Sequence, residues 1–202
     1  MKKLFISFAE KLIAVSIIFT LYSQAATASS GIFETYIIIQ ANGGSANYYD
    51  LYASTANPDF QGYNFGTFSC ANSLVIKGGQ NKTYKNGADD ILNGYLYYKV
   101  YKNGTDPNTV SFTSINLAFD INLSNPGDQQ WTTSTANNNI LQGLADGTYT
   151  VEVYSSADFT YNGNSGTHYQ NVGGTNYKAT FTISNPIIIT TNPTTPDRKS
   201  VV

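Results

Sequence analysis

Two side chain types that often carry catalysis occur once each in this chain, as His168 and Cys70. A Ser-His-Asp hydrolase would have to use His168, but no G-x-S-x-G stretch or other nucleophile signature accompanies it. The Gly- and Asn-rich stretch around it, "NGNSGTHYQNVGGTN", predicts a polar loop. A Cys-His pair has no positive support, and Cys70 is expected to be a small buried residue. The sequence therefore predicts no catalytic residue and a protein that is not an enzyme.

Metal ligands are also sparse. One His and one Cys cannot complete a four-ligand zinc site without two carboxylates, and no carboxylates stand at a zinc-site spacing. Calcium is a second interpretation, because aspartates in predicted loops offer the oxygen ligands that Ca²⁺ takes. The aspartates concerned are Asp89, Asp90, Asp106 and Asp128. None matches the EF-hand spacing, and Asp and Asn commonly form turns, so we expect turns and no cofactor, with Ca²⁺ as the alternative.

Aromatic residues make up 14% of the chain. A row of exposed rings can stack on sugar rings, but cross-strand Tyr pairs that stabilise a sheet produce the same pattern. The candidate ligand contacts are Tyr97 and Tyr101, which share the outer face of one predicted strand and are expected to face water. Trp131 lies in the polar stretch "DQQWTTST" and either forms an exposed platform or plugs one end of the fold.

The elements that would position these residues are short strands. Apolar and polar residues alternate with period two between clusters of Gly, Asn, Asp and Ser, which is typical of antiparallel strands. The segments with this pattern are "FETYIIIQ", "YYDLYA", "SLVIKG", "YLYYKVYK", "FTSINLAFDINL", "TYTVEVY" and "NYKATFTIS". Seven or more such strands without βαβ spacing predict an all-β fold, an immunoglobulin-like β-sandwich, with a jelly roll as the alternative.

The alternation also predicts which side chains face the core. The inward set in three of these strands is Leu96, Tyr98 and Val100; Ile115, Leu117, Phe119, Ile121 and Leu123; and Tyr177, Ala179, Phe181 and Ile183. Tyr149 enters a strand directly after the turn Leu144-Ala145-Asp146-Gly147. This placement predicts a tyrosine corner, in which the hydroxyl ties the turn to the strand; ordinary core packing is the alternative.

The N-terminus has the layout of a secretory signal peptide. Lys2 and Lys3 precede an apolar stretch, and Ala26-Thr27-Ala28 supplies the small residues that signal peptidase accepts. We therefore expect residues 1–28 to be a signal peptide and the mature chain to begin near Ser29, secreted or at the cell surface. No later stretch approaches the ~20 apolar residues of a membrane span.

The domain organisation that follows is a β-sandwich domain over residues 29–185 and a Thr/Pro linker over residues 186–196. Charged residues are only 12% of the chain, and the net charge is −2. A weakly acidic chain lacks the basic footprint of a nucleic-acid-binding protein. A single cysteine excludes a disulfide within the chain.

Several blocks in order resemble a known module. They are "GIFETYIIIQANGGSANYYDLYASTANPDFQGYNFGTF", "LVIKGGQNKTYKNGADDILNGYLYYKVYK", "ILQGLADGTYTVEVY" and "SGTHYQNVGGTNYKATFTI". Together they cover nearly all of residues 31–184, and they resemble the N-terminal β-rich module of surface and secreted proteins exported by the bacterial type IX secretion system. The resemblance implies a β-rich extracellular module, followed in longer relatives by other modules and a C-terminal sorting domain. It carries no catalytic residues onto this chain, which has no room for a sorting domain after residue 196.

The last six residues, "DRKSVV", resemble the translation of a widely used sequencing adapter. Arg198 within them is the single arginine of the chain. We therefore expect residues 197–202 to be a non-native tail and the chain to be a fragment of a longer protein that breaks off near Pro196.

These observations together predict a non-enzymatic exported module of a cell-surface or secreted protein, with an adhesive or structural role. The alternative is a carbohydrate-binding module of a lost polysaccharide-active enzyme. The expected partners are a surface polysaccharide or another cell-surface protein, and not nucleic acid.

Overall fold

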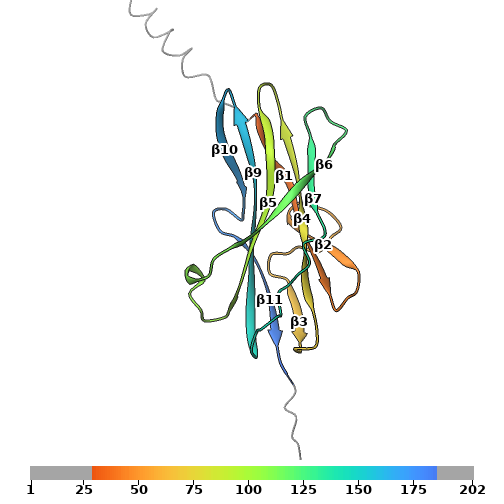
Figure 1. Cartoon of the computed structure of the whole chain (residues 1–202), viewed down its shortest axis with the longest axis vertical. Helices are drawn as coiled ribbons and strands as arrows, with labels where there is room; N and C mark the ends of the chain where they lie inside the picture. Colours follow the sequence, from red (N-terminus) through yellow and green to blue (C-terminus); the bar gives the residue numbers. More distant parts are fainter. Residues whose placement is uncertain (1–28, 186–202) are drawn as a thin grey trace, which may run out of the picture.

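The computed structural model describes residues 29–185 of the chain. The predicted signal peptide, linker and tail lie outside the described residues. Apart from one short 3₁₀ turn, η1 (Pro107–Thr109), the regular structure between residues 29 and 185 consists of strands (Figure 1). The strands are β1 (Ser30–Ala41), β2 (Ala46–Tyr52), β3 (Asn64–Phe68), β4 (Leu74–Lys85), β5 (Asp90–Lys102), β6 (Thr113–Asn122), β7 (Gln129–Thr133), β8 (Asn138–Asn139), β9 (Gly147–Tyr161), β10 (Asn164–Gln170) and β11 (Tyr177–Ile183). The prediction of an all-β fold is confirmed.

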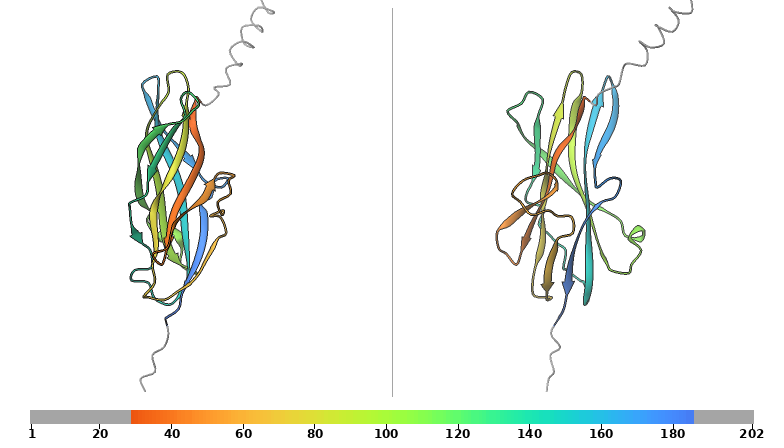
Figure 2. Two further views of the ribbon diagram at one scale, coloured as in Figure 1. Left: turned by 90° about the vertical axis from the view of Figure 1, so that its right-hand side faces the viewer. Right: turned by 180° about the vertical axis from the view of Figure 1, so that it is seen from behind.

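The strands form one curled, mixed sheet. Its hydrogen-bonded order is β2-β1-β4-β7-β6-β5-β9-β11-β3, with β10 beside β9 and β8 beside β4. The strand pairs are antiparallel except β3 and β11, which run parallel. The first half of β6, residues 113–117, pairs with β5, whereas residues 118–122 pair with β7. β6 therefore joins the two halves of the sheet, which curl toward each other as the side view shows (Figure 2).

The core lies between the two halves. Its fully buried side chains come from both of them, and the largest include Phe60, Phe181, Ile37, Ile39, Leu74, Ile76, Leu96, Leu117, Val151 and Val153. The Asn81 side chain of β4 donates a hydrogen bond of 2.9 Å to the Ser156 carbonyl of β9. Each fully buried aliphatic or aromatic side chain contributes roughly 1.5–3 kcal/mol, so this interior is the main source of stability.

The predicted alternation holds best in β11. Tyr177, Ala179, Phe181 and Ile183 are all buried, and the residues between them are not. In β9, Tyr149, Val151 and Val153 are buried as predicted, but Glu152 between them is buried as well. In β5, Leu96 is buried and Tyr98 and Val100 pack against the core from partly buried positions.

The alternation fails in the second half of β6. Ile115 and Leu117 are buried as predicted, but Phe119 and Ile121 are each 49% exposed, so the prediction that they face the core is wrong. The register between β6 and β7 shifts between Phe119 and Ile121, after the strand has left β5. An irregularity of this kind redirects the side chains that follow it, which accounts for Ile121. Phe119 lies before the irregularity, in the part of β6 that has already left β5 and pairs with β7.

Within residues 29–185, no helix has the length and apolar character needed to cross a bilayer.

Candidate functional site

The side chains that point away from the core on β5, β9 and β11 form the candidate site. The loop of residues 103–112, which contains η1, folds back over part of this outer face. The Lys99 ammonium donates a hydrogen bond of 2.9 Å to the Pro107 carbonyl and lies 4.4 Å from the centre of the Phe112 ring. The face is therefore divided into a covered part below the loop and an open part beyond it.

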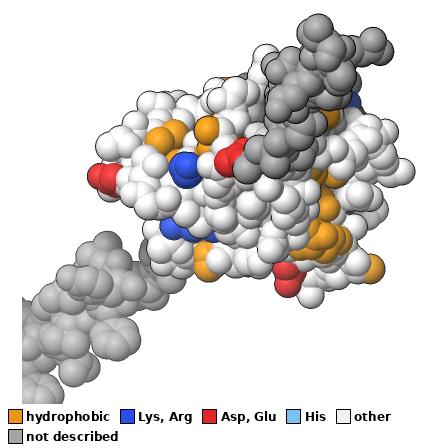
Figure 3. Space-filling model, turned by 90° about the horizontal axis from the view of Figure 1, so that it is seen from below, with side chains coloured by type: hydrophobic (Ala, Val, Ile, Leu, Met, Phe, Trp, Pro, Cys, Tyr) orange, Lys and Arg blue, Asp and Glu red, His pale blue; other side chains and the backbone are white. Residues whose placement is uncertain are grey.

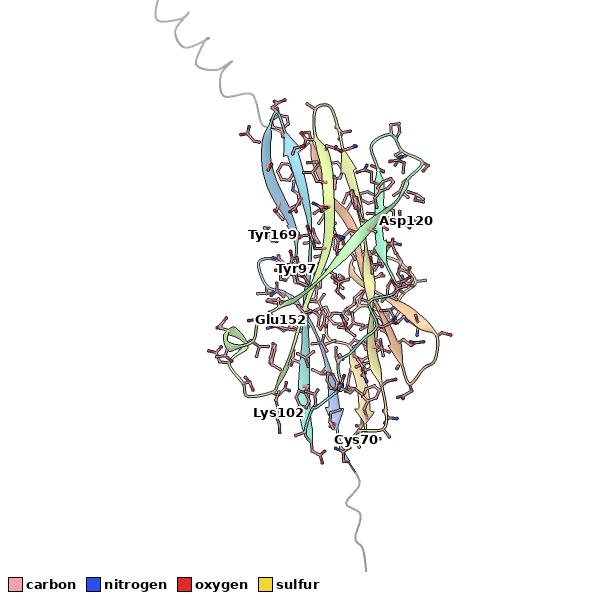
Figure 4. The ribbon with its side chains drawn as sticks, in the orientation of Figure 1. Cys70, Tyr97, Lys102, Asp120, Glu152 and Tyr169 are labelled. Atoms are coloured by element: carbon pink, nitrogen blue, oxygen red, sulfur yellow. The ribbon has the colours of Figure 1, made fainter. Side chains whose placement is uncertain are left out.

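The open part carries a tyrosine cluster, which we define as Tyr95, Tyr97, Tyr154 and Tyr169. Tyr97 and Tyr154 are register partners on β5 and β9, and their rings stack at 4.6 Å with an interplanar angle of 8°. Tyr95 leans on Tyr97 at 6.0 Å and 39°, and Tyr169 leans on Tyr154 at 6.2 Å and 49°. Tyr169 of β10 is 63% exposed (Figure 4). The predicted outward position of Tyr97 agrees with this arrangement, although its ring is only partly exposed.

The rings of the tyrosine cluster do not lie in one plane. Tyr97 and Tyr154 cover each other's faces, and the outer rings are tilted by 39° and 49°. Phe112 meets Tyr154 edge-on at 4.9 Å. The cluster therefore presents ring edges and the exposed ring of Tyr169 rather than a flat stacking surface.

The covered part is centred on the carboxylate of Glu152 in β9. Asn176 Nδ2 donates to Oε1 at 2.6 Å, and the Tyr101 hydroxyl donates to Oε2 at 2.9 Å. Lys99 Nζ lies 3.6 Å from Oε1, and the side chains of Lys99 and Glu152 are only 6% and 7% exposed. Lys178 reaches Oε2 at 3.9 Å from a half-exposed position. We call Lys99, Tyr101, Glu152 and Asn176 the buried polar network.

Two pKa values in this network are displaced from their ordinary values. Burial acts to raise the pKa of Glu152, but the hydrogen bonds from Asn176 and Tyr101 and the charge of Lys99 outweigh it and lower that pKa. Burial and the hydrogen bond to Glu152 raise the pKa of Tyr101 to about 12. The carboxylate is thus held ionised and the phenol neutral.

Two of the predicted ligand contacts are not at the surface. Tyr101 is buried below the 103–112 loop, so the expectation that it faces water is wrong. Trp131 is 7% exposed, packs edge-on against Phe119 at 5.5 Å and donates from Nε1 to Thr83 Oγ1 at 3.2 Å. It belongs to the core, so the exposed-platform alternative is wrong as well.

Tyr149 lies at the start of β9. Its hydroxyl donates a hydrogen bond of 2.8 Å to the carbonyl of Ala145, four residues upstream, and its ring stacks on Phe181 at 5.4 Å. This is the hydrogen bond of a tyrosine corner.

His168 lies on β10, so the prediction that it sits in a loop is wrong. Its ring stacks on Phe159 at 4.2 Å, and its Nε2 lies 2.9 Å from the Ser30 hydroxyl oxygen. Burial lowers the pKa of His168, against the opposing charge of Asp89. Ser30 is 2% exposed, so a substrate cannot reach this hydroxyl. No sequence signal connects Ser30 with His168, because they are 138 residues apart.

Cys70 is exposed, and the prediction that it is buried is wrong. It follows β3 near the end of the molecule where β11 finishes (Figure 4), and its backbone N–H donates to Asn185 Oδ1 at 2.6 Å.

Three of the four aspartates considered for Ca²⁺ take part in local contacts, whereas Asp89 is buried with one carboxylate oxygen that has no hydrogen-bond partner among the described residues. Asp106 caps η1 by accepting from the Asn108 N–H at 3.0 Å, and Asp128 accepts from Asn125 at 3.1 Å. Asp90 pairs with Lys85. In the part of the chain that the structure describes, His, Cys, Asp and Glu do not gather in a group of three or more that could hold a metal ion.

A pocket of about 430 Å³ opens beside β2 and the connection from β10 to β11. Its lining combines aromatic, carboxylate and carboxamide side chains, from Asp50, Leu51, Tyr52, Asp59, Gln61, Asn171, Val172, Gly173 and Tyr177. Asp50 is already satisfied by Thr55 and Asn57. The size falls in the range of small-ligand sites, which are typically ~300–1,000 Å³.

Charged side chains are few on the surface. The view along the long axis shows isolated red and blue atoms among mostly uncharged surface, with small groups of hydrophobic side chains (Figure 3). This end of the molecule therefore carries no strong electrostatic field.

Neither protein-family models nor curated proteins gave a match to this chain.

Proposed function

We propose that residues 29–185 form a non-enzymatic module of a secreted or cell-surface protein and that the module acts in adhesion, through the tyrosine cluster. The observation that carries this proposal is the 63% exposed ring of Tyr169, supported from behind by Tyr154 and Tyr97. Tyrosine is enriched at protein interfaces, and rings already held in place lose little rotamer freedom on binding. Because the tyrosine cluster presents mostly ring edges, it suits a protein surface. A sugar ring would need an open aromatic face on which to stack.

Export rests on the sequence. The signal-peptide layout of residues 1–28 and the resemblance to N-terminal modules of proteins exported by the type IX system both support a place outside the cell. The low charge of the surface agrees with binding through neutral groups.

An enzyme is disfavoured by the surroundings of His168. The hydroxyl beside it is buried, and the pocket of about 430 Å³ is lined by other residues. A nucleophile and its base must both reach a bound substrate.

For the fold, we assign the curled sheet as a variant of the immunoglobulin-like sandwich rather than a jelly roll. The hydrogen bond from Tyr149 to Ala145 and the two facing halves support this assignment. A crystal structure in which β6 pairs with one half alone would support two separate sheets. A crystal structure of a jelly roll with eight strands in two Greek keys would contradict it.

The adhesion proposal is tested with beads coated with the full chain and offered to whole bacterial cells. We expect Tyr169→Ala to reduce the number of bound beads about tenfold, in line with the ~1–2 kcal/mol of an interface ring. Protease treatment of the cells should abolish binding. The matched control is Tyr161→Ala, which removes a 47% exposed tyrosine outside the cluster. Equal binding by wild type and Tyr169→Ala would contradict the proposal.

A second candidate function, carbohydrate binding, is favoured by the pocket. Tyr52, which is 49% exposed, offers aromatic surface, and Asp59, Gln61 and Asn171 offer the planar polar groups that hydrogen-bond sugar hydroxyls. An array of plant, algal and bacterial polysaccharides tests this candidate, with Asn171→Ala as the variant expected to lose the signal. Silence across the array would remove carbohydrate binding from consideration and would leave adhesion to proteins standing.

A further inference from the structure

We propose that Lys99 and Asn176 become joined by a covalent amide bond within the chain, with Glu152 as the acid–base group of the reaction. The inference goes beyond the proposed function and does not depend on it. It rests on the buried polar network, where an amine, a carboxylate and a carboxamide meet under a cover of aromatic side chains.

Two of the three side chains lie on neighbouring strands, and the third directly precedes the next strand of the sheet. Lys99 on β5 is the register partner of Glu152 on β9, and Asn176 directly precedes β11 on the other side of β9. Strands two places apart in a sheet are separated by roughly 9–10 Å. Asn176 lies two residues before Lys178, the register partner of Glu152 on β11, so the lysine and asparagine side chains approach each other diagonally over the middle strand. The middle strand thus carries the acid, and the two groups to be joined approach it from its two sides.

Both reacting groups are directed to one oxygen atom. Lys99 Nζ lies 3.6 Å from Glu152 Oε1, and Asn176 Nδ2 donates to the same Oε1 at 2.6 Å. The nitrogen that would attack and the nitrogen that would leave therefore share one proton acceptor. A group placed in this way can take a proton from the first and give it to the second.

The surroundings of the pair exclude water. The side chains of Lys99 and Glu152 are 6% and 7% exposed, and the Lys99 ammonium lies over the rings of Phe112 at 4.4 Å and Tyr101 at 5.8 Å. Burial disfavours separated charges. The resting pair is the Lys99 ammonium and the Glu152 carboxylate, and the passage of one proton from Lys99 to Glu152 within the pair leaves the net charge unchanged and frees the amine that attacks.

The reaction needs no oxidant or cofactor. The Lys99 nitrogen attacks Cγ of Asn176, so that a new C–N bond forms and the Cγ–Nδ2 bond breaks. Glu152 passes the proton that it received to the leaving nitrogen, which departs as ammonia and takes up the second proton released by the lysine nitrogen. One ammonium group and one carboxamide become one secondary amide and one ammonium ion, and Glu152 ends as the carboxylate with which it began.

Lys178 is the other lysine near Glu152, and it provides the control. Its Nζ lies 3.9 Å from Oε2, on the opposite side of the carboxylate from the Asn176 contact, and its side chain is 46% exposed. Lys178 meets the other carboxylate oxygen, not the one that accepts from Asn176, so it is not placed to compete with Lys99.

The test is mass spectrometry of the purified full chain under denaturing conditions. We expect a mass lower than that of the sequence by one ammonia molecule, and a protease digest in which the peptide containing Lys99 is joined to the peptide containing Asn176. Lys99→Ala, Asn176→Ala and Glu152→Gln should each restore the full mass. Lys178→Ala should keep the loss.

A wild-type chain that is folded and carries the full mass of its sequence would overturn the proposal, whatever the variants do. Loss of ammonia that persists in Lys99→Ala, or that maps to an asparagine other than Asn176, would overturn it too, because succinimide formation releases the same molecule. The digest of the wild-type protein shows whether the Lys99–Asn176 bond is present even if a variant does not fold.

Discussion

The covered and open parts of the outer face are built from the same strands, yet their chemistry is opposite. Tyr97, Lys99 and Tyr101 are successive outward positions of β5. Tyr97 remains partly exposed in the open part, whereas Lys99 and Tyr101 are buried below the 103–112 loop. The alternation of a strand determines which way a side chain points, but here a loop determines whether it meets water.

This difference has an energetic counterpart. In the covered part, the Lys99 and Glu152 side chains are shielded from water, so Glu152 needs partners in the protein, which are Lys99 and Tyr101 of β5 and Asn176 beside β11. In the open part, the tyrosines are uncharged and support one another through ring contacts. Mutations in the covered part should therefore affect stability, and mutations in the open part should affect binding.

The largest expected effect is that of Glu152→Gln. Removal of the carboxylate charge leaves Lys99 buried and unpaired, which should lower the free energy of unfolding by about 3–5 kcal/mol. Denaturant unfolding measures this loss. The matched control is Asp90→Asn, which removes the pair with Lys85, where the Asp90 side chain is 51% exposed; we expect less than about 1 kcal/mol. Similar losses of unfolding free energy in both variants would contradict the claim that the covered part depends on its charges.

The next effect separates two tyrosines of the same strand face. Tyr101→Phe deletes a buried hydrogen bond to an ionised carboxylate and should cost about 1.5–3 kcal/mol. Tyr97→Phe keeps the stacked ring and should change the free energy of unfolding by less than about 0.5 kcal/mol. Thermal and denaturant unfolding measure both changes. Equal losses of unfolding free energy in the two variants would show that the 103–112 loop does not create the difference between the covered and open parts.

Low pH should destabilise the folded protein through protonation of Glu152 in the covered part. Because the pKa of Glu152 is lowered in the folded chain, its contribution to stability is present above its unfolded value, near 4.5, and is lost as the pH falls through the folded value. We expect the free energy of unfolding to decline below about pH 4.5 and the decline to be shallower in Glu152→Gln. A residual slope should remain from Glu34, whose pKa is also lowered. If the free energy of unfolding changes with pH in the same way in the wild type and in Glu152→Gln, Glu152 is not the group responsible for the decline.

The smallest effect is expected in the open part. Tyr169→Ala removes a ring that is 63% exposed and should change stability by less than about 0.5 kcal/mol. The melting temperature, measured beside the bead assay, therefore separates a binding defect from a folding defect. A loss of several degrees would show that the ring supports the sheet instead.

The sequence predicted the strands with regular alternation, such as β9 and β11, because both cover the core along their length. It did not predict β10, whose composition is polar. The signal was present in Asn162 and Gly163, which both have positive φ and form the two-residue turn from β9 to β10. That dipeptide indicates a hairpin even where the following strand is not apolar.

The candidate site was less predictable than the fold. Asn176 and Glu152 are 24 residues apart and meet only through strand register, which the alternation of either strand cannot reveal. Trp131 stands between glutamine and threonine, and its burial depends on β6 crossing from β5 to β7. Contacts created by register, crossing strands and loop cover need the three-dimensional structure.

The two ends of the described chain lie at opposite ends of the long axis, where β1 begins and β11 finishes (Figure 1). The strands run close to this axis, so a pull between residues 29 and 185 is directed along the strands rather than across them. The hydrogen bonds between neighbouring strands are then loaded in shear, and many must yield together. A covalent tie from β5 to the start of β11, over β9, would hold the C-terminal strand under such tension after its hydrogen bonds had given way.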